Sequence, residues 1–255
     1  MKKILLISGH GAGDPGATAT YGSTTYKEAT ETITMVRKNR KYLKKRQVQV
    51  DLYPTRSATF RDLQNGNLQV DFSQYDYVLE VHFNAFKPDT SGDGKNKGTE
   101  IFVPQGGKED VAIRIVNSVA KLGFNNRGKK SVNYSVIYHA KTSGTDAALL
   151  EVCFIDDKDD MNIYIPNKDK IAEQIAMALI VSFNLKLKSD NTIKVGDKVR
   201  IKKGAKDLNT KKKFSDFVYG TTYTVIKTSS SRKQIVFGLN GIAVGKCWKR
   251  YVEEV

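Results

Sequence analysis

The chain has 255 residues, 40% of them hydrophobic and 27% charged, with 20 Gly and 5 Pro, a composition that excludes disordered, collagen-like and low-complexity proteins. Its formal net charge of +15 predicts attraction to a polyanion such as nucleic acid, an anionic membrane surface or a bacterial wall carrying anionic polymers. The apolar runs are far shorter than the roughly 18 to 20 residues that span a bilayer, so no stable membrane insertion is expected.

Residues 1–185 alternate apolar runs with amphipathic stretches, which predicts strands alternating with helices. We expect one α/β domain with a mostly parallel central sheet and helices on both faces. The expected strands are, in chain order, Lys3–Ser8, Val48–Leu52, Tyr77–Phe83, Thr99–Val103 and Ala147–Phe154. The expected helical segments are Lys27–Lys45, a turn from Ser57, Lys108–Leu122 and Lys168–Leu185.

The pattern changes after this region. Residues 186–192 are polar and predict a linker, and residues 193–255 show short alternating strands with turn signals, typical of a small all-β barrel. From Ser189 onward the chain has 15 Lys and Arg against 6 Asp and Glu, so this quarter carries +9 of the net charge. We therefore expect a second, strongly basic domain.

Neither the N-terminal sequence nor the two cysteines indicate a secreted protein. The apolar run after Met-Lys-Lys stops at Ser8, short of the roughly 7 to 15 residues of a signal-peptide core. Cys153 and Cys247 are distant in sequence, so each is expected to be a small buried apolar residue rather than half of a disulfide. No secretory signal and no particular oligomeric state is predicted.

Three side chains predict one convergent site at the ends of core strands. His10 follows the first strand in the glycine-rich run GHGAGDPGA, where the backbone can approach a ligand closely, and His82 lies near the end of Tyr77–Phe83. Glu151 lies in an otherwise apolar strand, where an ionised carboxylate is costly unless it is paired, protonated or beside a metal. Ligands of open α/β sheets collect outside the carboxyl ends of the strands.

Two histidine nitrogens, one carboxylate and an open position form the pattern of a catalytic zinc centre. With His10 and His82 as two ligands, Glu28 is the candidate for the third. Glu28 has a rival interpretation, because Thr25 and Glu28 fit the T-x-x-E capping box at the start of a helix. Glu31, one helical turn further on, is an alternative ligand.

An ordered set of motifs in residues 1–185 resembles the type 3 N-acetylmuramoyl-L-alanine amidase family, especially the versions in bacteriophage endolysins. The set comprises GHGAGDPGA, a Glu that opens the first helix, TR at 55–56, VHFNA, GTEIFV and LLEVCF. This resemblance implies that His10, Glu28 and His82 bind Zn²⁺ and that Glu151 is catalytic. The substrate it implies is the amide between N-acetylmuramic acid and L-alanine in peptidoglycan.

The chemistry implied is a metal-assisted amide hydrolysis. Zinc held by three protein groups lowers the pKa of a bound water to about 7 and polarises a carbonyl. Glu151 would then take the proton of the water and return it to the departing amine. The motifs depart from the commonest family pattern in the CFIDD that stands in place of GFISN, and in Glu80 in place of a small residue.

Strand alternation places Glu80, His82 and Asn84 on one face. Glu80 is therefore either an alternative ligand or a partner that orients His82, and Asn84 is a candidate for binding substrate. His139 is a candidate for lining the cleft or binding the metal, and Arg56 for holding substrate or pairing with a carboxylate. For Asn84, His139 and Arg56, a purely structural role is the competing interpretation.

The basic C-terminal segment resembles bacterial SH3-like modules, which implies a wall anchor that binds peptidoglycan or its anionic polymers. Together with the missing signal, the resemblance to endolysin amidases implies a phage or prophage lysis enzyme that accumulates in the host cytoplasm and needs a separate membrane-permeabilising partner to reach the wall. Nucleic acid is not an expected partner, although a nucleic-acid-binding barrel is the rival from another class. A second alternative is a hydrolase with Cys153 as nucleophile, which alternation places on the face of Glu151, and a histidine as base.

Overall fold

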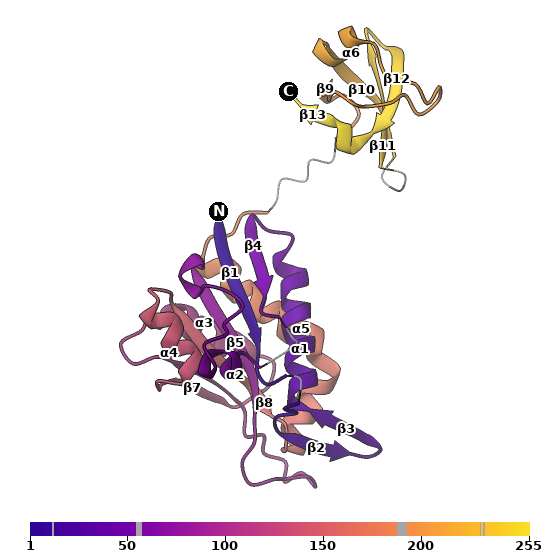
Figure 1. Cartoon of the computed structure of the whole chain (residues 1–255). Coiled ribbons are helices and arrows are strands. Elements are labelled where there is room, and N and C mark those ends of the chain that lie inside the picture. The colour runs from indigo at the N-terminus through magenta and orange to yellow at the C-terminus, as the bar shows by residue number, and fades with distance from the viewer. Residues whose placement is uncertain (12, 55–57, 188–192, 230, 232) are drawn as a thin grey trace. The chain divides into compact units, whose positions relative to one another are not determined.

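Figure 1 shows the computed structural model of the chain, which describes residues 1–11, 13–54, 58–187, 193–229, 231 and 233–255. These residues form two compact units, Met1–Lys188 and Ser189–Val255. Each unit has a hydrophobic core of its own. Arg56, the start of the turn expected from Ser57 and most of the linker expected over 186–192 lie outside the described residues.

A six-stranded sheet forms the centre of the larger unit. In spatial order its strands are β4 (Val48–Leu52), β1 (Lys2–Ser8), β5 (Tyr77–Asn84), β8 (Ala147–Phe154), β6 (Thr99–Val103) and β7 (Asn126–Ser131). Neighbouring strands are parallel except β6 and β8, which are antiparallel. The expectation of an α/β fold with a mostly parallel sheet is thus confirmed.

The apolar strands are buried on both faces because helices cover both. In β1, Ile4 and Leu6 pack into one core, and Leu5 and Ile7 into a second core on the opposite face. The helices over the first core are α1 (Glu28–Leu43), α3 (Asp110–Ala120) and α5 (Lys158–Ser182); those over the second are α2 (Thr59–Gln64), the 3₁₀ helix η1 (Phe72–Gln74) and α4 (Ser135–Thr142). None of the helices in the described part of the chain is long and apolar enough to cross a membrane.

Several elements differ from the sequence-based expectation. The hairpin of β2 (Thr18–Tyr21) and β3 (Thr24–Lys27), which lies beside the start of α1 in Figure 1, was not predicted, nor were β7 and α4. The closing helix begins at Lys158, not at Lys168, because the Asp157 side chain caps it by accepting from the Asp160 backbone N–H. Pro166 lies inside this helix without ending it.

The smaller unit is built on a five-stranded sheet. Its strands, in spatial order, are β12 (Ile242–Trp248), β11 (Gln234–Leu239), β10 (Thr222–Ser229), β9 (Lys198–Ile201) and β13 (Val252–Glu254), with the short helices α6 (Asp216–Gly220) and η2 (Lys249–Tyr251). Every neighbouring pair is antiparallel. Tyr223, Phe237 and Cys247 lie at the centre of its core, fully buried. Both cysteines are free and buried, as predicted.

Candidate active site

The loop after β1 presents the His10 side chain. The Gly9 N–H donates to the Val81 carbonyl at 2.8 Å, which holds the loop against β5. His10 adopts a left-handed backbone conformation with φ of 59°, which is uncommon for a residue other than glycine. Its Nδ1 lies 3.1 Å from Asp14 Oδ2, and Asp14 Oδ1 accepts from the Gly16 N–H at 3.1 Å. The loop therefore fixes the imidazole through one of its two nitrogens.

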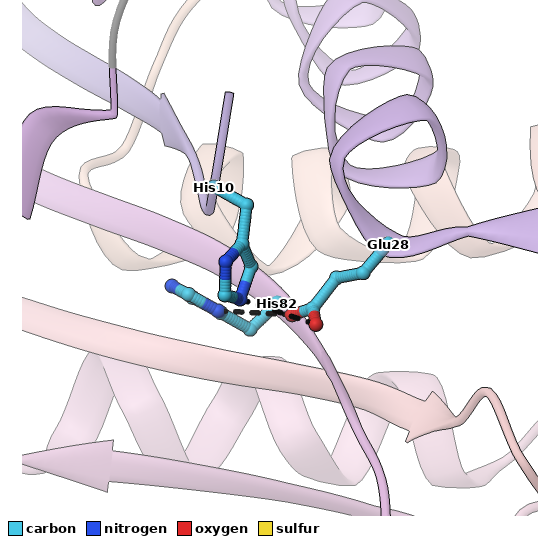
Figure 2. Close-up of side chains that lie close together, drawn as sticks. All are labelled: His10, Glu28 and His82. Carbon is cyan, nitrogen blue, oxygen red and sulfur yellow. Dashed lines mark hydrogen bonds and ion pairs between the residues drawn. The ribbon is translucent and has the colours of Figure 1, made fainter. Parts of the chain in front are cut away.

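Glu28 joins the two histidines, and the capping-box interpretation of this residue is wrong. Thr25 lies in β3, Lys27 is the N-cap of α1, and no side chain makes the cap hydrogen bond. The Glu28 carboxylate instead accepts from the Ala17 and Phe83 backbone N–H groups, both at 2.9 Å. It lies 3.1 Å from His10 Nε2 and 3.0 Å from His82 Nδ1. Figure 2 shows both imidazoles beside the Glu28 carboxylate.

His82 and Glu151 stand on neighbouring strands. They are register partners across β5 and β8, and Glu100 of β6 is the partner of Glu151 on its other side. The second nitrogen of His82, Nε2, lies 3.2 Å from Glu80 Oε1. Glu151 Oε2 is buried and, among the residues that the structure describes, has no hydrogen-bond partner. Strand pairing thus places an uncommitted carboxylate oxygen beside the histidine pair.

The charges of the site follow from its burial and its carboxylates. Burial lowers the pKa of His82, but Glu28 and Glu80 outweigh burial and hold that pKa well above its usual value. The hydrogen bond with Glu28 raises the pKa of His10 as well. Burial alone would raise the pKa of Glu28, but its hydrogen bonds with the two histidines lower it to about 2. The site therefore favours positive charge beside Glu28, and a divalent cation could supply that charge.

Glu151 behaves differently from Glu28. Burial raises the pKa of Glu151 to about 8, although His82 acts in the opposite direction. The carboxylates of Glu28, Glu100 and Glu80 reinforce the rise. The pKa of Glu28 is thus lowered and that of Glu151 is raised. Such a difference between two nearby carboxyl groups is a common feature of sites that transfer protons.

The alternative ligands lie elsewhere or hold other partners. Glu31 faces the core under α1, α3 and α5. There its Oε2 accepts from Tyr164 Oη and Lys168 Nζ, both at 2.6 Å. His139 lies in the last turn of α4, and its ring contacts Phe72 with centroids 5.7 Å apart. Neither residue belongs to the group formed by His10, Glu28 and His82. Of the alternative ligands, only Glu80 lies beside this group.

Asn84 is already bonded within the chain. Its Nδ2 donates to Glu100 Oε1 at 2.6 Å, and its Oδ1 accepts from the Ala85 N–H at 2.8 Å. Glu100 is in turn paired with Arg127 Nε at 2.8 Å and with Lys130. A role for Asn84 in binding substrate remains a prediction.

Cys153 does not share the face of Glu151, so that expectation is wrong. His82 pairs with Glu151 but Asn84 pairs with Phe154, so β8 has one more residue than β5 between these pairs. Such a bulge breaks the alternation of side chains, and Val152 and Cys153 both enter the core under α1, α3 and α5. Cys153 is fully buried, and burial holds the pKa of its thiol well above the usual value. This burial and the raised pKa favour a packing role for Cys153 over that of a nucleophile.

A cleft of about 300 Å³ opens over the two histidines. Asp14, Glu80 and Glu151 line it together with His10 and His82. Two exposed aromatic side chains, Phe60 of α2 and Tyr134 just before α4, stand on its walls. Asp14 and both aromatic residues were not predicted from the sequence; of the three, only Asp14 has a sequence signal, as a carboxylate four residues after His10 in GHGAGDPGA.

Comparison with known proteins identifies relatives of the larger unit. Residues 4–181 match the Amidase_3 family, described as N-acetylmuramoyl-L-alanine amidase. The uncharacterized protein CPE1502 of Clostridium perfringens is 29% identical over 164 residues, which are 64% of this chain and 47% of the relative. The chain therefore spans less than half the length of that protein.

Solved structures share the fold. The N-acetylmuramoyl-L-alanine amidase from Clostridium difficile 630 superposes with a TM-score of 0.59 at 19% identity, covering 72% of this chain and 97% of that one. The catalytic domain of the CD27L endolysin, which targets Clostridia difficile, gives a TM-score of 0.50 at 24% identity, covering 74% of this chain and 100% of that one. At these identities the likeness establishes the fold of the larger unit and nothing finer.

Proposed function

The chain belongs, through residues 4–181, to the N-acetylmuramoyl-L-alanine amidase family, and from this premise we propose that it is a peptidoglycan hydrolase. The bond cleaved is the amide between the lactyl group of N-acetylmuramic acid and L-alanine. The observation that carries the proposal is the meeting of His10 and His82 at the buried Glu28 carboxylate, beside a cleft that both histidines and Glu151 line. The fold shared with an endolysin catalytic domain supports a lytic role.

The donor set fits Zn²⁺. His10 Nε2 and His82 Nδ1 lie 3.1 and 3.0 Å from the Glu28 carboxylate oxygens, spacings that one ion with bonds of about 2 Å can bridge. Each imidazole turns one nitrogen toward Glu28 and the other toward a further carboxylate, Asp14 for His10 and Glu80 for His82. A carboxylate on the outer nitrogen fixes the tautomer and orientation of a metal-binding histidine.

The chain's own groups would carry the proton transfers. A bound zinc ion supplies polarisation of the amide carbonyl and acidification of a water. A cation held by His10, Glu28 and His82 would lower the raised pKa of Glu151. In its ionised form Glu151 Oε2, buried beside His82 and without a hydrogen-bond partner among the described residues, could take the proton of the attacking water. The same oxygen then returns that proton to the departing L-alanine nitrogen. Phe60 and Tyr134 offer flat, exposed rings against which sugar or peptide can pack.

The smaller unit would hold the enzyme at its polymeric substrate, as an SH3-like wall-binding module. It is an all-β unit with a surplus of basic residues, 15 Lys and Arg against 6 Asp and Glu from Ser189 onward. Tethering a catalytic unit to its insoluble substrate raises its effective concentration there. Nucleic-acid binding is not favoured as the main function, because it would leave the family membership of the larger unit without a role.

The test is digestion of purified peptidoglycan followed by mass analysis of the fragments. We expect free lactyl-muramic ends and peptides that begin with L-alanine, and we expect a chelator to abolish both products. The Glu151→Gln variant should bind zinc with wild-type stoichiometry and lose nearly all turnover. New reducing sugar ends, or full turnover by Glu151→Gln, would contradict the proposal.

A further inference from the structure

The cations of the smaller unit have no carboxylate partner among the described residues. No Lys or Arg nitrogen in residues 193–229, 231 and 233–255 lies within 4.0 Å of a carboxylate oxygen of Asp197, Asp207, Asp216 or Glu253. In the larger unit, by contrast, ion pairs join many of the basic side chains to carboxylates. The positive field of the smaller unit is therefore not neutralised by its own acidic groups, and it is available to an external anion.

Part of this charge is organised by strand pairing. Val236 of β11 is the register partner of Lys227 on one side and Lys246 on the other, so one cross-strand row has a lysine at each end. The next row on the same face pairs Gln234 with Trp248. Adjacent strands are about 4.8 Å apart, which separates the two lysine backbones by about 10 Å.

Two shallow depressions follow these rows and adjoin at the Gln234–Trp248 pair. Lys227 and Lys246 line the first, and Lys233, Lys249 and Arg250 line the second with Trp248. We call this surface the cationic strip and define it as Lys227, Lys233, Lys246, Trp248, Lys249 and Arg250. It brings five cations and one aromatic ring onto a continuous stretch of surface.

Trp248 is the aromatic member of the strip. It is 36% exposed, although tryptophan is a large apolar residue that is usually well buried. The Arg250 guanidinium lies 5.9 Å from the centroid of its ring. An exposed ring beside cations suits a ligand that has both a flat apolar face and negative charges, such as a sugar linked to phosphate.

We propose that the cationic strip binds a phosphodiester-linked glycopolymer of the bacterial cell wall. This inference rests on the proposed function and names the partner of its anchoring unit. Phosphates would be bound by the lysines and Arg250, and a sugar ring would stack on Trp248. The strip has one aromatic ring, whereas sites for single-stranded nucleic acid stack successive bases on several rings, and Tyr223 and Phe237 of the same sheet are buried in the core.

The experiment measures binding of the full chain to purified Gram-positive walls by co-sedimentation, over a range of salt concentrations. The walls are used intact and after hydrofluoric acid, which removes phosphodiester polymers and leaves peptidoglycan. The variants are Lys227→Gln/Lys246→Gln and Trp248→Ala. The matched control, Lys202→Gln/Lys203→Gln, removes the same charge from a different depression, which Asp216 and Glu253 also line.

We expect the Lys227→Gln/Lys246→Gln variant to bind intact walls about tenfold more weakly at 0.05 M salt, with the slope of log affinity against log salt reduced by about 1 to 2. The control variant should bind within about twofold of wild type, since its lysines meet no phosphate. Trp248→Ala should weaken binding without changing the salt slope, because stacking releases no counterions. Acid-treated walls should bind wild type and the Lys227→Gln/Lys246→Gln variant equally weakly.

Three results would overturn the proposal. Equal losses in both double variants would show that only net charge matters, and unchanged binding to acid-treated walls would show that the ligand is peptidoglycan. Tighter binding of a single-stranded oligonucleotide than of intact walls at 0.15 M salt would make nucleic acid the ligand. Release of L-alanine-terminated peptides from soluble peptidoglycan fragments should be the same in all variants, so failure of the hydrolase proposal would appear separately, in the wild type.

Discussion

Gly9 offers a stringent test of the site geometry, because a single methyl group there would collide with a proposed zinc ligand. A Cβ built on Gly9 lies 2.3 to 2.5 Å from three atoms of the His82 ring, whereas ordinary contacts begin near 3.4 Å. The Gly9 backbone has little freedom to retreat, since its N–H donates to the Val81 carbonyl and its carbonyl accepts from Thr32 Oγ1, both at 2.8 Å. In Gly9→Ala the imidazole must therefore shift by about 1 Å.

The expected cost has two parts. Overpacking of this kind destabilises a protein by about 1–3 kcal/mol, which urea unfolding of Gly9→Ala would measure. A shift of about 1 Å also moves Nδ1 away from Glu28, and misplacement on that scale lowers turnover by about 100-fold. Zinc affinity, measured by competition with a chromophoric chelator, should fall in parallel. Gly220→Ala is the control, because a Cβ at Gly220 meets no atom within 4 Å.

Stability and zinc affinity are measured separately in Gly9→Ala, so the experiment distinguishes two explanations. Loss of stability with unchanged zinc affinity would mean that the collision is relieved away from the ligand atoms. Wild-type stability, zinc affinity and turnover in Gly9→Ala would refute the reasoning from close contact, and with it the position assigned to the His82 ring.

Three further predictions follow from contacts around the site and the core. Glu80→Gln should weaken zinc binding by about 10- to 100-fold, because an outer carboxylate orients its histidine; an unchanged zinc dissociation constant would remove Glu80 from the site. Iodoacetamide should leave activity within about twofold while a chelator abolishes it, since Cys153 is fully buried; inactivation by alkylation before unfolding would restore the thiol alternative. Asp160 is fully buried, and burial raises its pKa from 3.8 to about 7, although it accepts from the Phe154 N–H at 2.9 Å. The folded chain then binds more protons than the unfolded chain between about pH 4 and pH 7, so the contribution of Asp160 to the free energy of unfolding falls as pH rises through this window; the difference in that free energy between wild type and Asp160→Asn should show this slope, and a flat difference would exclude it.

The strands of the sheet could be predicted because their signal is local. Runs such as Ile4–Ile7 are apolar at every position, which is what a strand covered on both faces requires. β7 escaped prediction because it is an edge strand of sequence NRGKKS, with no apolar run to mark it. Lysines at the edge of a sheet discourage pairing with other chains. The same lysines make the segment polar, so its sequence does not predict a strand.

The closing helix and Cys153 show how local rules are overridden. Pro166 and the polar residues before it favour a loop in sequence, but the Asp157 cap and burial of Tyr164 and Met161 in the core extend α5 across them. Strand alternation places Cys153 with Glu151, but one extra residue in β8 turns the thiol into the opposite core. Whether such a bulge forms depends on how β8 pairs with its partner strand. The sequence of β8 alone does not indicate it.

The sequence by itself indicated which apolar segments form strands, a basic second unit, and histidines and a glutamate at the ends of strands, but not the order of those strands in the sheet. Whether Glu28 capped a helix or joined two imidazoles was decided only by tertiary structure, because T-x-x-E satisfies both roles equally well in sequence. Glu28 follows the β2–β3 hairpin directly and is the first residue of α1. The pairing of β1 with β5 places His10 and His82 at the same edge of the sheet. A convergent site is a property of distances between segments, and those distances are set by which strands pair and not by any residue's neighbours along the chain.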